Sequence, residues 1–136
     1  MKNRLWRIVD ANVNRSREGL RVCEDILRFV CDDRALAQAL KKCRHQLTQT
    51  ILALPIPAGR LLKFRESAHD VGRKSVIRDQ KKTNLASIFS ANFKRTQESL
   101  RVLGECSKIE FTPLTKKFQK LRFEIYELEK RAAQKF

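Results

Sequence analysis

The chain has few residues that interrupt helices, with four glycines and three prolines among 136 residues. This scarcity favours a few long helices over many short strands joined by turns. The chain also lacks an apolar run long enough for a secretory leader or a membrane span. We therefore expect a cytoplasmic protein with no membrane partner. With 42% apolar and 33% charged residues, the composition is globular and sufficient for one core.

Familiar phosphate and metal motifs are absent too. The sequence contains neither Gly-x-x-x-x-Gly-Lys-Ser/Thr nor Gly-x-Gly-x-x-Gly, so a phosphate-binding function would not use these loop cradles. The cysteines form no Cys-x-x-Cys pair and lack the His spacing of a zinc site. Each falls in a run that reads as helix, so we expect small core residues in a reduced protein. They are Cys23, Cys31, Cys43 and Cys106.

The net charge of +15 is extreme for this length and predicts an anionic partner. Nucleic acid and a phosphorylated small molecule both fit such a surface. One Trp and one Tyr supply a poor platform for stacking bases, and no helix-turn-helix or zinc finger is apparent. Nucleic acid is thus an unlikely partner, but a nucleic-acid-binding module stays open as an alternative.

Apolar residues recur at helical spacing in four runs. The predicted helices cover about 5–31, 34–54, 84–109 and 112–134, with Asp33 and Thr112 as caps. The segment 55–83 between the second and third helices has no sustained periodicity. Long charged connections of this kind are usually functional or disordered. We predict an all-α fold, a single domain over residues 1–136.

Two stretches of the chain repeat each other. Residues 10–22 return as residues 90–102, at an offset of 80 residues (91 − 11) without a gap. The identical pairs are Ala11/Ala91, Asn12/Asn92, Arg15/Arg95, Glu18/Glu98, Leu20/Leu100, Arg21/Arg101 and Val22/Val102. The repeat predicts two αα-hairpins, about 5–54 and 84–134, packed into one four-helix bundle with a functional loop between them.

The repeated positions are polar where a helix packed in a bundle should be apolar. At about 100° per residue, the apolar stripe of the first helix is predicted to centre on Leu5, Cys23 and Val30. Asn12 and Arg15 fall within this stripe, and Glu18 falls on its edge. Asn92, Arg95 and Glu98 repeat this arrangement. Because burying such groups is costly unless they are paired, we predict one polar cavity shared by the two copies. A buried Arg–Glu network without a ligand is the alternative.

Further candidates lie on the opposite face of the first helix and in the loop. Asn14, Arg17 and Arg21 could help hold phosphate, since guanidinium groups match phosphate oxygens. Oxygen ligands for Mg²⁺ could come from Glu18, Asp25, Glu98, Glu105 and Asp70. In the loop, Asp70 and Gly72 are followed by two basic residues, Arg73 and Lys74. This short segment could contact a phosphate group.

Motifs spread over nearly the whole chain carry a resemblance to a known family. They are Arg7-Ile8-Val9-Asp10-Ala11-Asn12, Asn14-Arg15, Arg17-Glu18-Gly19-Leu20-Arg21-Val22, Glu24-Asp25, Arg28-Phe29, Arg44-His45, Asp70-Val71-Gly72, Ala91-Asn92-Phe93-Lys94-Arg95, Gln97-Glu98, Leu100-Arg101 and Ser107-Lys108. With these motifs the chain resembles a small family of bacterial helical proteins that act as hydroxymethylpyrimidine-phosphate kinases in thiamine synthesis. Proteins of that family occur alone or fused ahead of thiamine-phosphate synthase.

The resemblance implies an enzyme that transfers a phosphoryl group from ATP, with Mg²⁺, to hydroxymethylpyrimidine monophosphate. In that function Arg15 and Arg95, with Arg21 or Arg101, would grip phosphates. Asn12 and Asn92 would bond to the pyrimidine or a phosphate, and Glu18, Glu98 or Asp70 would hold Mg²⁺. Thiamine-phosphate synthase is a possible partner, and a non-catalytic partner of a thiamine enzyme is a further alternative. Apolar residues outside the stripes, such as Phe123 and Tyr126, point to a homodimer.

Overall fold

The computed structural model describes residues 2–74 and 84–136, so part of the predicted loop, residues 75–83, lies outside the described residues. Four long helices dominate the chain and confirm the all-α bundle: α1 (Lys2–Phe29), α2 (Arg34–Leu52), α4 (Leu85–Glu110) and α5 (Thr115–Ala132). Short helical pieces connect or extend them: α3 (Ala58–Leu61), η1 (Leu62–Phe64), η3 (Thr112–Leu114) and η4 (Ala133–Lys135).

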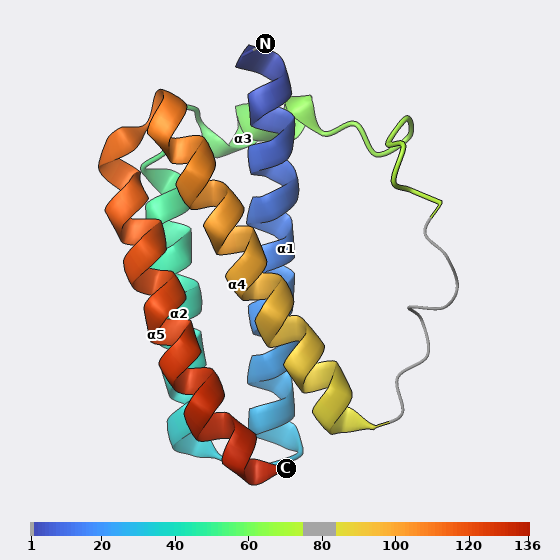
Figure 1. The fold of residues 1–136 in the computed structure, drawn as a ribbon, viewed down its shortest axis with the longest axis vertical. Helices are drawn as coiled ribbons and strands as arrows, with labels where there is room; N and C mark the ends of the chain where they lie inside the picture. Colours follow the sequence, from blue (N-terminus) through green and yellow to red (C-terminus); the bar gives the residue numbers. More distant parts are fainter. Residues whose placement is uncertain (1, 75–83) are drawn as a thin grey trace.

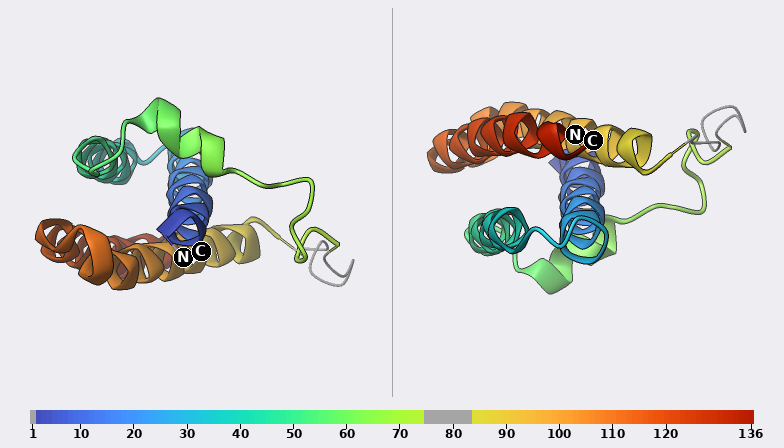
Figure 2. Two further views of the ribbon diagram at one scale, coloured as in Figure 1. Left: turned by 90° about the horizontal axis from the view of Figure 1, so that it is seen from above. Right: turned by 90° about the horizontal axis from the view of Figure 1, so that it is seen from below.

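The two hairpins form two layers, α1–α2 and α4–α5 (Figure 2). Helices α1 and α4 run antiparallel along one side of the bundle, and α2 and α5 run along the other (Figure 1). The segment after η1 leaves the bundle beside α1, on the side away from α2 and α5 (Figure 1). Within the described ranges, none of the helices combines the length and apolar character needed to cross a bilayer.

Local chemistry sets most of the helix boundaries. Asp33 caps α2, where its carboxylate accepts a hydrogen bond from the Leu36 amide at 2.9 Å. Asn84 caps α4 and forms a reciprocal capping box with Ser87. The prediction that Thr112 caps the last helix is wrong, because Thr112–Leu114 forms a 3₁₀ turn first and α5 begins at Thr115.

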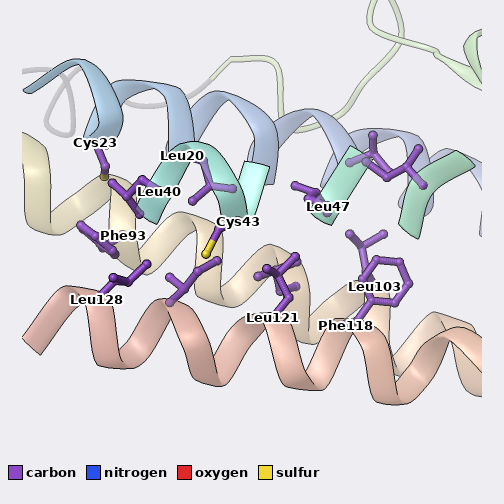
Figure 3. Close-up of a cluster of buried hydrophobic side chains, with 14 of the residues drawn as sticks. Leu20, Cys23, Leu40, Cys43, Leu47, Phe93, Leu103, Phe118, Leu121 and Leu128 are labelled. Atoms are coloured by element: carbon purple, nitrogen blue, oxygen red, sulfur yellow. The ribbon is translucent and has the colours of Figure 1, made fainter. Parts of the chain in front are cut away.

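The core lies between the four long helices, and Figure 3 shows the side chains that fill it. Buried positions of α2, and Leu54 just after it, recur in η3 and α5 at an offset of 78 residues (118 − 40): Leu36/Leu114, Leu40/Phe118, Cys43/Leu121, Leu47/Ile125 and Leu54/Ala132. The first helices of the hairpins match at 80 residues (92 − 12) instead. The repeat therefore extends to the second helices, with a shorter connection in the second hairpin.

All four cysteines were predicted to be core residues, and the structure confirms this for three of them. Cys23, Cys43 and Cys106 are buried, and Cys31 is half-buried against the core. Burial raises the pKa of the Cys23 thiol to about 12 and that of Cys43 to about 11. These thiols stay protonated at neutral pH and act as small apolar groups.

Helices α1 and α4 cross closely at Gly19. A Cβ atom placed on Gly19 would overlap Oγ1 of Thr96 and lie 2.9 Å from the carbonyl oxygen of Asn92. Ser16 and its repeat counterpart Thr96 are both fully buried at the crossing. Their hydroxyls donate to the carbonyls of Asn12 and Asn92, at 2.8 and 2.9 Å. Because these polar groups are satisfied within their own helices, small side chains there permit close packing.

Two glycine substitutions should have opposite effects on stability. Gly19→Ala should cost at least about 1 kcal/mol net, because overpacking exceeds the gain in helix propensity. Gly104→Ala, also inside a long helix, should stabilise by about 0.5–1 kcal/mol, because its Cβ would meet only Phe118 Cβ at 3.9 Å. Urea unfolding of both variants measures the two free energies. Equal effects would contradict a close crossing at Gly19.

Candidate functional site

The predicted polar cavity inside the bundle is not formed by the repeated charged residues. Arg15, Glu18, Arg95 and Glu98 are all exposed. The prediction centred the apolar stripe on Leu5, Cys23 and Val30, but Val30 lies beyond the end of α1 and is exposed. The buried face also includes Trp6 and Val13, on the side of the stripe away from Arg15. The buried face is centred nearer Ser16 and Leu20. The observed buried face is thus rotated about the helix axis from the predicted one by less than the ~100° between successive residues. This difference places Arg15 on the exposed side.

The repeated asparagines are satisfied locally. Asn12 is buried and Asn92 is half-buried. Their side-chain amides donate to the carbonyls of Ile8 and Ile88, four residues earlier, at 2.9 and 2.8 Å. Each amide therefore has one proton and its oxygen left for another partner. The two asparagines therefore make the same hydrogen bond in the two copies. This bond lies within each helix and does not join the two helices.

Arg15 and Arg95 lie at the rim of the helix crossing. Each precedes the buried crossing residue, Ser16 or Thr96, by one position and thus by about 100° of rotation. Glu24 bonds to Arg44 of α2 and therefore marks the side of α1 that faces α2. Arg15 lies on the opposite side of α1. Arg15 therefore occupies the outer rim, and the repeat gives Arg95 the corresponding place on α4.

A pocket of about 630 Å³ opens on this outer side, between the first half of α1 and the segment after η1. Its volume suits a small phosphorylated molecule. Four arginines line it: Arg4, Arg7, Arg15 and Arg65. The other lining residues are Ile8, Asp10, Ala11, Asn12, Asn14, Glu66, Ser67 and Asp70. Four of the predicted site residues thus meet here: Asn12, Asn14, Arg15 and Asp70.

Arg65 is anchored to α1 by a bidentate ion pair. Its Nε and one terminal nitrogen donate to the two carboxylate oxygens of Asp10 at 2.9 and 3.0 Å. Asp10 is buried, whereas the Arg65 side chain is 43% exposed. The bond to Asp10 raises the pKa of Arg65, with a smaller contribution from the charge of Glu18. The pair fixes one wall of the pocket and leaves part of the guanidinium accessible.

The segment that follows carries its own local bonds. A carboxylate oxygen of Asp70 accepts a hydrogen bond from the Gly72 amide at 3.0 Å, which forms a tight turn. Asp70 lines the pocket, whereas Gly72 does not. His69 bonds to Glu66 at 2.9 Å, and this contact lowers the pKa of Glu66. Gly72 therefore belongs to the turn that holds Asp70 and does not itself line the pocket.

A model of the ThiD2 family matches residues 7–131. The chain belongs to the ThiD2 family. The match begins at Arg7 on α1 and ends in the last turns of α5. The helix crossing, both copies of the repeat and the pocket lining other than Arg4 therefore lie within the matched residues.

Relatives of this ThiD2-family chain are named thiamine-phosphate synthase. The one from Thermosynechococcus vestitus is 37% identical over 127 residues, which is 93% of this chain and 34% of the relative. The one from Prochlorococcus marinus strain SARG is 39% identical over 125 residues, 90% of this chain and 34% of the relative. This chain spans about a third of the length of these curated relatives. No solved structure matches the chain significantly.

The predicted magnesium ligands do not form a cluster. Among the residues that the structure describes, no three Asp, Glu, His or Cys side chains come together as metal ligands. Glu105 instead bonds to Lys108 and Arg101 on its own helix, and these contacts lower the pKa of Glu105. Asp25 and Glu98 are exposed. These carboxylates therefore do not fit a resident Mg²⁺ cage.

The remaining phosphate candidates lie outside the pocket. Arg21 contacts Glu24 at 3.4 Å, and Arg101 contacts Glu105 at 3.1 Å. Arg17 is exposed on α1. The sequence patterns missed the ion pairs that matter most: Asp10 with Arg65, and the buried Glu24 with Arg44 at 2.8 Å. Each acid lies on the flank of α1 that a neighbouring segment covers, so only the tertiary arrangement reveals it.

Removing Arg65 should destabilise the protein more than removing the whole pair. Arg65→Ala leaves the buried Asp10 carboxylate without its partner and should cost about 1–3 kcal/mol. Adding Asp10→Asn removes that charge and should recover part of the loss. Urea unfolding of the wild type, both single variants and the double variant gives the coupling energy. A coupling indistinguishable from zero would show that the pair does not hold the pocket wall.

Proposed function

We propose that this chain transfers the γ-phosphoryl group of ATP to hydroxymethylpyrimidine monophosphate and thereby acts in thiamine biosynthesis. The observation that carries the proposal is the arginine-lined pocket on α1, built by a chain of the ThiD2 family. The proposal is also supported by relatives named thiamine-phosphate synthase, which contain a stretch similar to this chain. The pocket has four arginines and three carboxylates, Asp10, Glu66 and Asp70, so it favours anions.

The proposed reaction needs alignment and charge neutralisation more than covalent chemistry. A phosphate oxygen of the pyrimidine monophosphate attacks the γ-phosphorus of ATP. The bond from that phosphorus to the β,γ-bridging oxygen breaks, and ADP leaves. The acceptor oxygen is already ionised near neutral pH, so no general base is required. The absence of a buried histidine from the described pocket wall agrees with this scheme.

The pocket suggests distinct roles for its residues. Arg15 and the accessible part of Arg65 would hold the acceptor phosphate, because guanidinium groups bind phosphate oxygens in bidentate fashion. Asn12 would bond to the pyrimidine through the amide atoms that Ile8 leaves available. Arg95, at the rim of the same crossing, would contact the second phosphate group during transfer. Arg21 and Arg101 stay weaker candidates, since each already contacts a glutamate.

Magnesium would enter as part of the nucleotide substrate. Mg²⁺ usually binds to one or two carboxylates together with substrate phosphates and shields their charge. This requires no cage of protein ligands. Asp70 lies at the pocket and could supply one carboxylate oxygen.

The product would be the substrate of a partner enzyme. A pyrimidine diphosphate made here could pass to a thiamine-phosphate synthase, which fits the match of this chain to about a third of proteins with that name. Dimerisation also stays a prediction. Phe123 and Tyr126 are 53% and 40% exposed, as an apolar contact between two copies would require.

A coupled assay for ADP tests the proposal. The purified chain with ATP, Mg²⁺ and hydroxymethylpyrimidine monophosphate should release ADP above a control without pyrimidine, and ³¹P spectra should show a new diphosphate. Arg15→Ala should lower kcat/KM on the order of 100-fold, as expected when one phosphate-binding donor is lost. Circular dichroism should be unchanged, because Arg15 is exposed.

The control variant is Arg131→Ala, which removes an exposed arginine of α5 outside the pocket and should retain full activity. Arg95→Ala then reports whether the second copy of the repeat contributes. If the wild-type chain releases no ADP but binds a thiamine-phosphate synthase, the non-catalytic partner reading replaces the kinase. Equal activity of Arg15→Ala and Arg131→Ala would exclude the pocket as the site.

A further inference from the structure

The two halves of the repeat differ at one buried ion pair. In the first half, Glu24 on α1 is buried and accepts hydrogen bonds from Arg44 of α2, at 2.8 Å to Nε and 3.4 Å to a terminal nitrogen. Arg21 adds a contact at 3.4 Å. One carboxylate thus satisfies two guanidinium groups at the junction of α1 and α2.

In the second half, the arginine is present and the acid is missing. Arg122 on α5 corresponds to Arg44 at the offset of 78 residues (122 − 44), and Gly104 on α4 corresponds to Glu24 at the offset of 80 residues (104 − 24). The Nε atom of Arg122 is buried and has no hydrogen-bond partner. A buried donor left unpaired costs free energy that a bound acceptor would recover.

A cavity occupies the place of the missing carboxylate. It has a volume of about 130 Å³ and touches both Gly104 and Arg122. By the ~30 Å³ that each water takes in the liquid, this is room for about four waters or one small oxyanion. A Cβ atom on Gly104 would meet nothing closer than Phe118 Cβ at 3.9 Å. A side chain at position 104 could therefore start without a clash.

The charges around the cavity favour an anion. Arg101, Lys108 and Arg122 line it, against the single carboxylate of Glu105. Glu105 is already bonded to Lys108 at 2.9 Å and to Arg101 at 3.1 Å. The Arg122 guanidinium lies over the rings of Phe123 and Tyr126, at 5.5 and 5.9 Å. These rings hold the guanidinium plane but accept no hydrogen bond from Nε.

The geometry points to a second anion site, between α4 and α5, where a small oxyanion such as phosphate or a carboxylate binds to Arg122 in the place that Glu24 takes in the first half. Gln119 also lines the cavity, and its side-chain amide can donate to the same anion. This site is separate from the pocket on α1 and does not depend on the kinase proposal.

The experiment follows the Arg122 Nε–H resonance in ¹H–¹⁵N spectra while inorganic phosphate or acetate is added at constant ionic strength. Loss of the signal in Arg122→Lys assigns it. A saturable shift is expected in the wild type. In Gly104→Glu the new carboxylate should occupy the cavity and weaken the anion effect at least about tenfold, as a bidentate Arg–carboxylate bond would.

The matched control is Gly59→Glu, which adds the same charge at an exposed glycine with nothing within 4 Å of its Cβ position. This variant should retain the shift. Gly104→Glu should also melt at a higher temperature than Gly59→Glu without added anion, since it restores the ion pair. Saturation by phosphate or by acetate identifies the preferred oxyanion. No shift with either, or equal shifts in both variants, overturns the site.

Discussion

The close crossing of α1 and α4 is the constraint on which the rest of the structure depends. Gly19 allows the two helices to approach until Thr96 and the Asn92 carbonyl lie against its backbone. Ser16 and Thr96 can be buried there because each hydroxyl bonds within its own helix. The crossing sets the angle between the hairpins, and with it which residues of the repeat face the core and which reach the outer rim.

The repeat carries exposed arginines as well as buried positions. Arg15 and Arg95 are both exposed, and each precedes a buried residue of the crossing, Ser16 or Thr96. The segment after η1 lies against α1, held by the ion pair of Arg65 with Asp10. The pocket described above is therefore built on the first copy of the repeat together with residues 65–70.

The fold was largely predictable from sequence, and the site was predictable only in part. The spacing of Leu40, Cys43 and Leu47 placed α2, and the repeat placed the pairing of the hairpins. Arg15 was assigned to the interior because the predicted stripe was centred on Leu5, Cys23 and Val30. The buried face also includes Trp6 and Val13, which move its centre away from Arg15. Glu24 and Asp10 are buried by partners in other segments, Arg44 and Arg65, which no helical periodicity can indicate.

We propose that the outer face of α1 binds the pyrimidine phosphate. The most direct measurement is a titration of the ¹⁵N-labelled chain with hydroxymethylpyrimidine monophosphate, followed residue by residue. The largest shifts should fall in residues 4–15 and 65–70. A second basic groove of about 630 Å³ lies between α2 and α5, lined by Lys41, Lys42, Lys117 and Lys120 among others. Shifts confined to that groove would contradict binding on the outer face of α1.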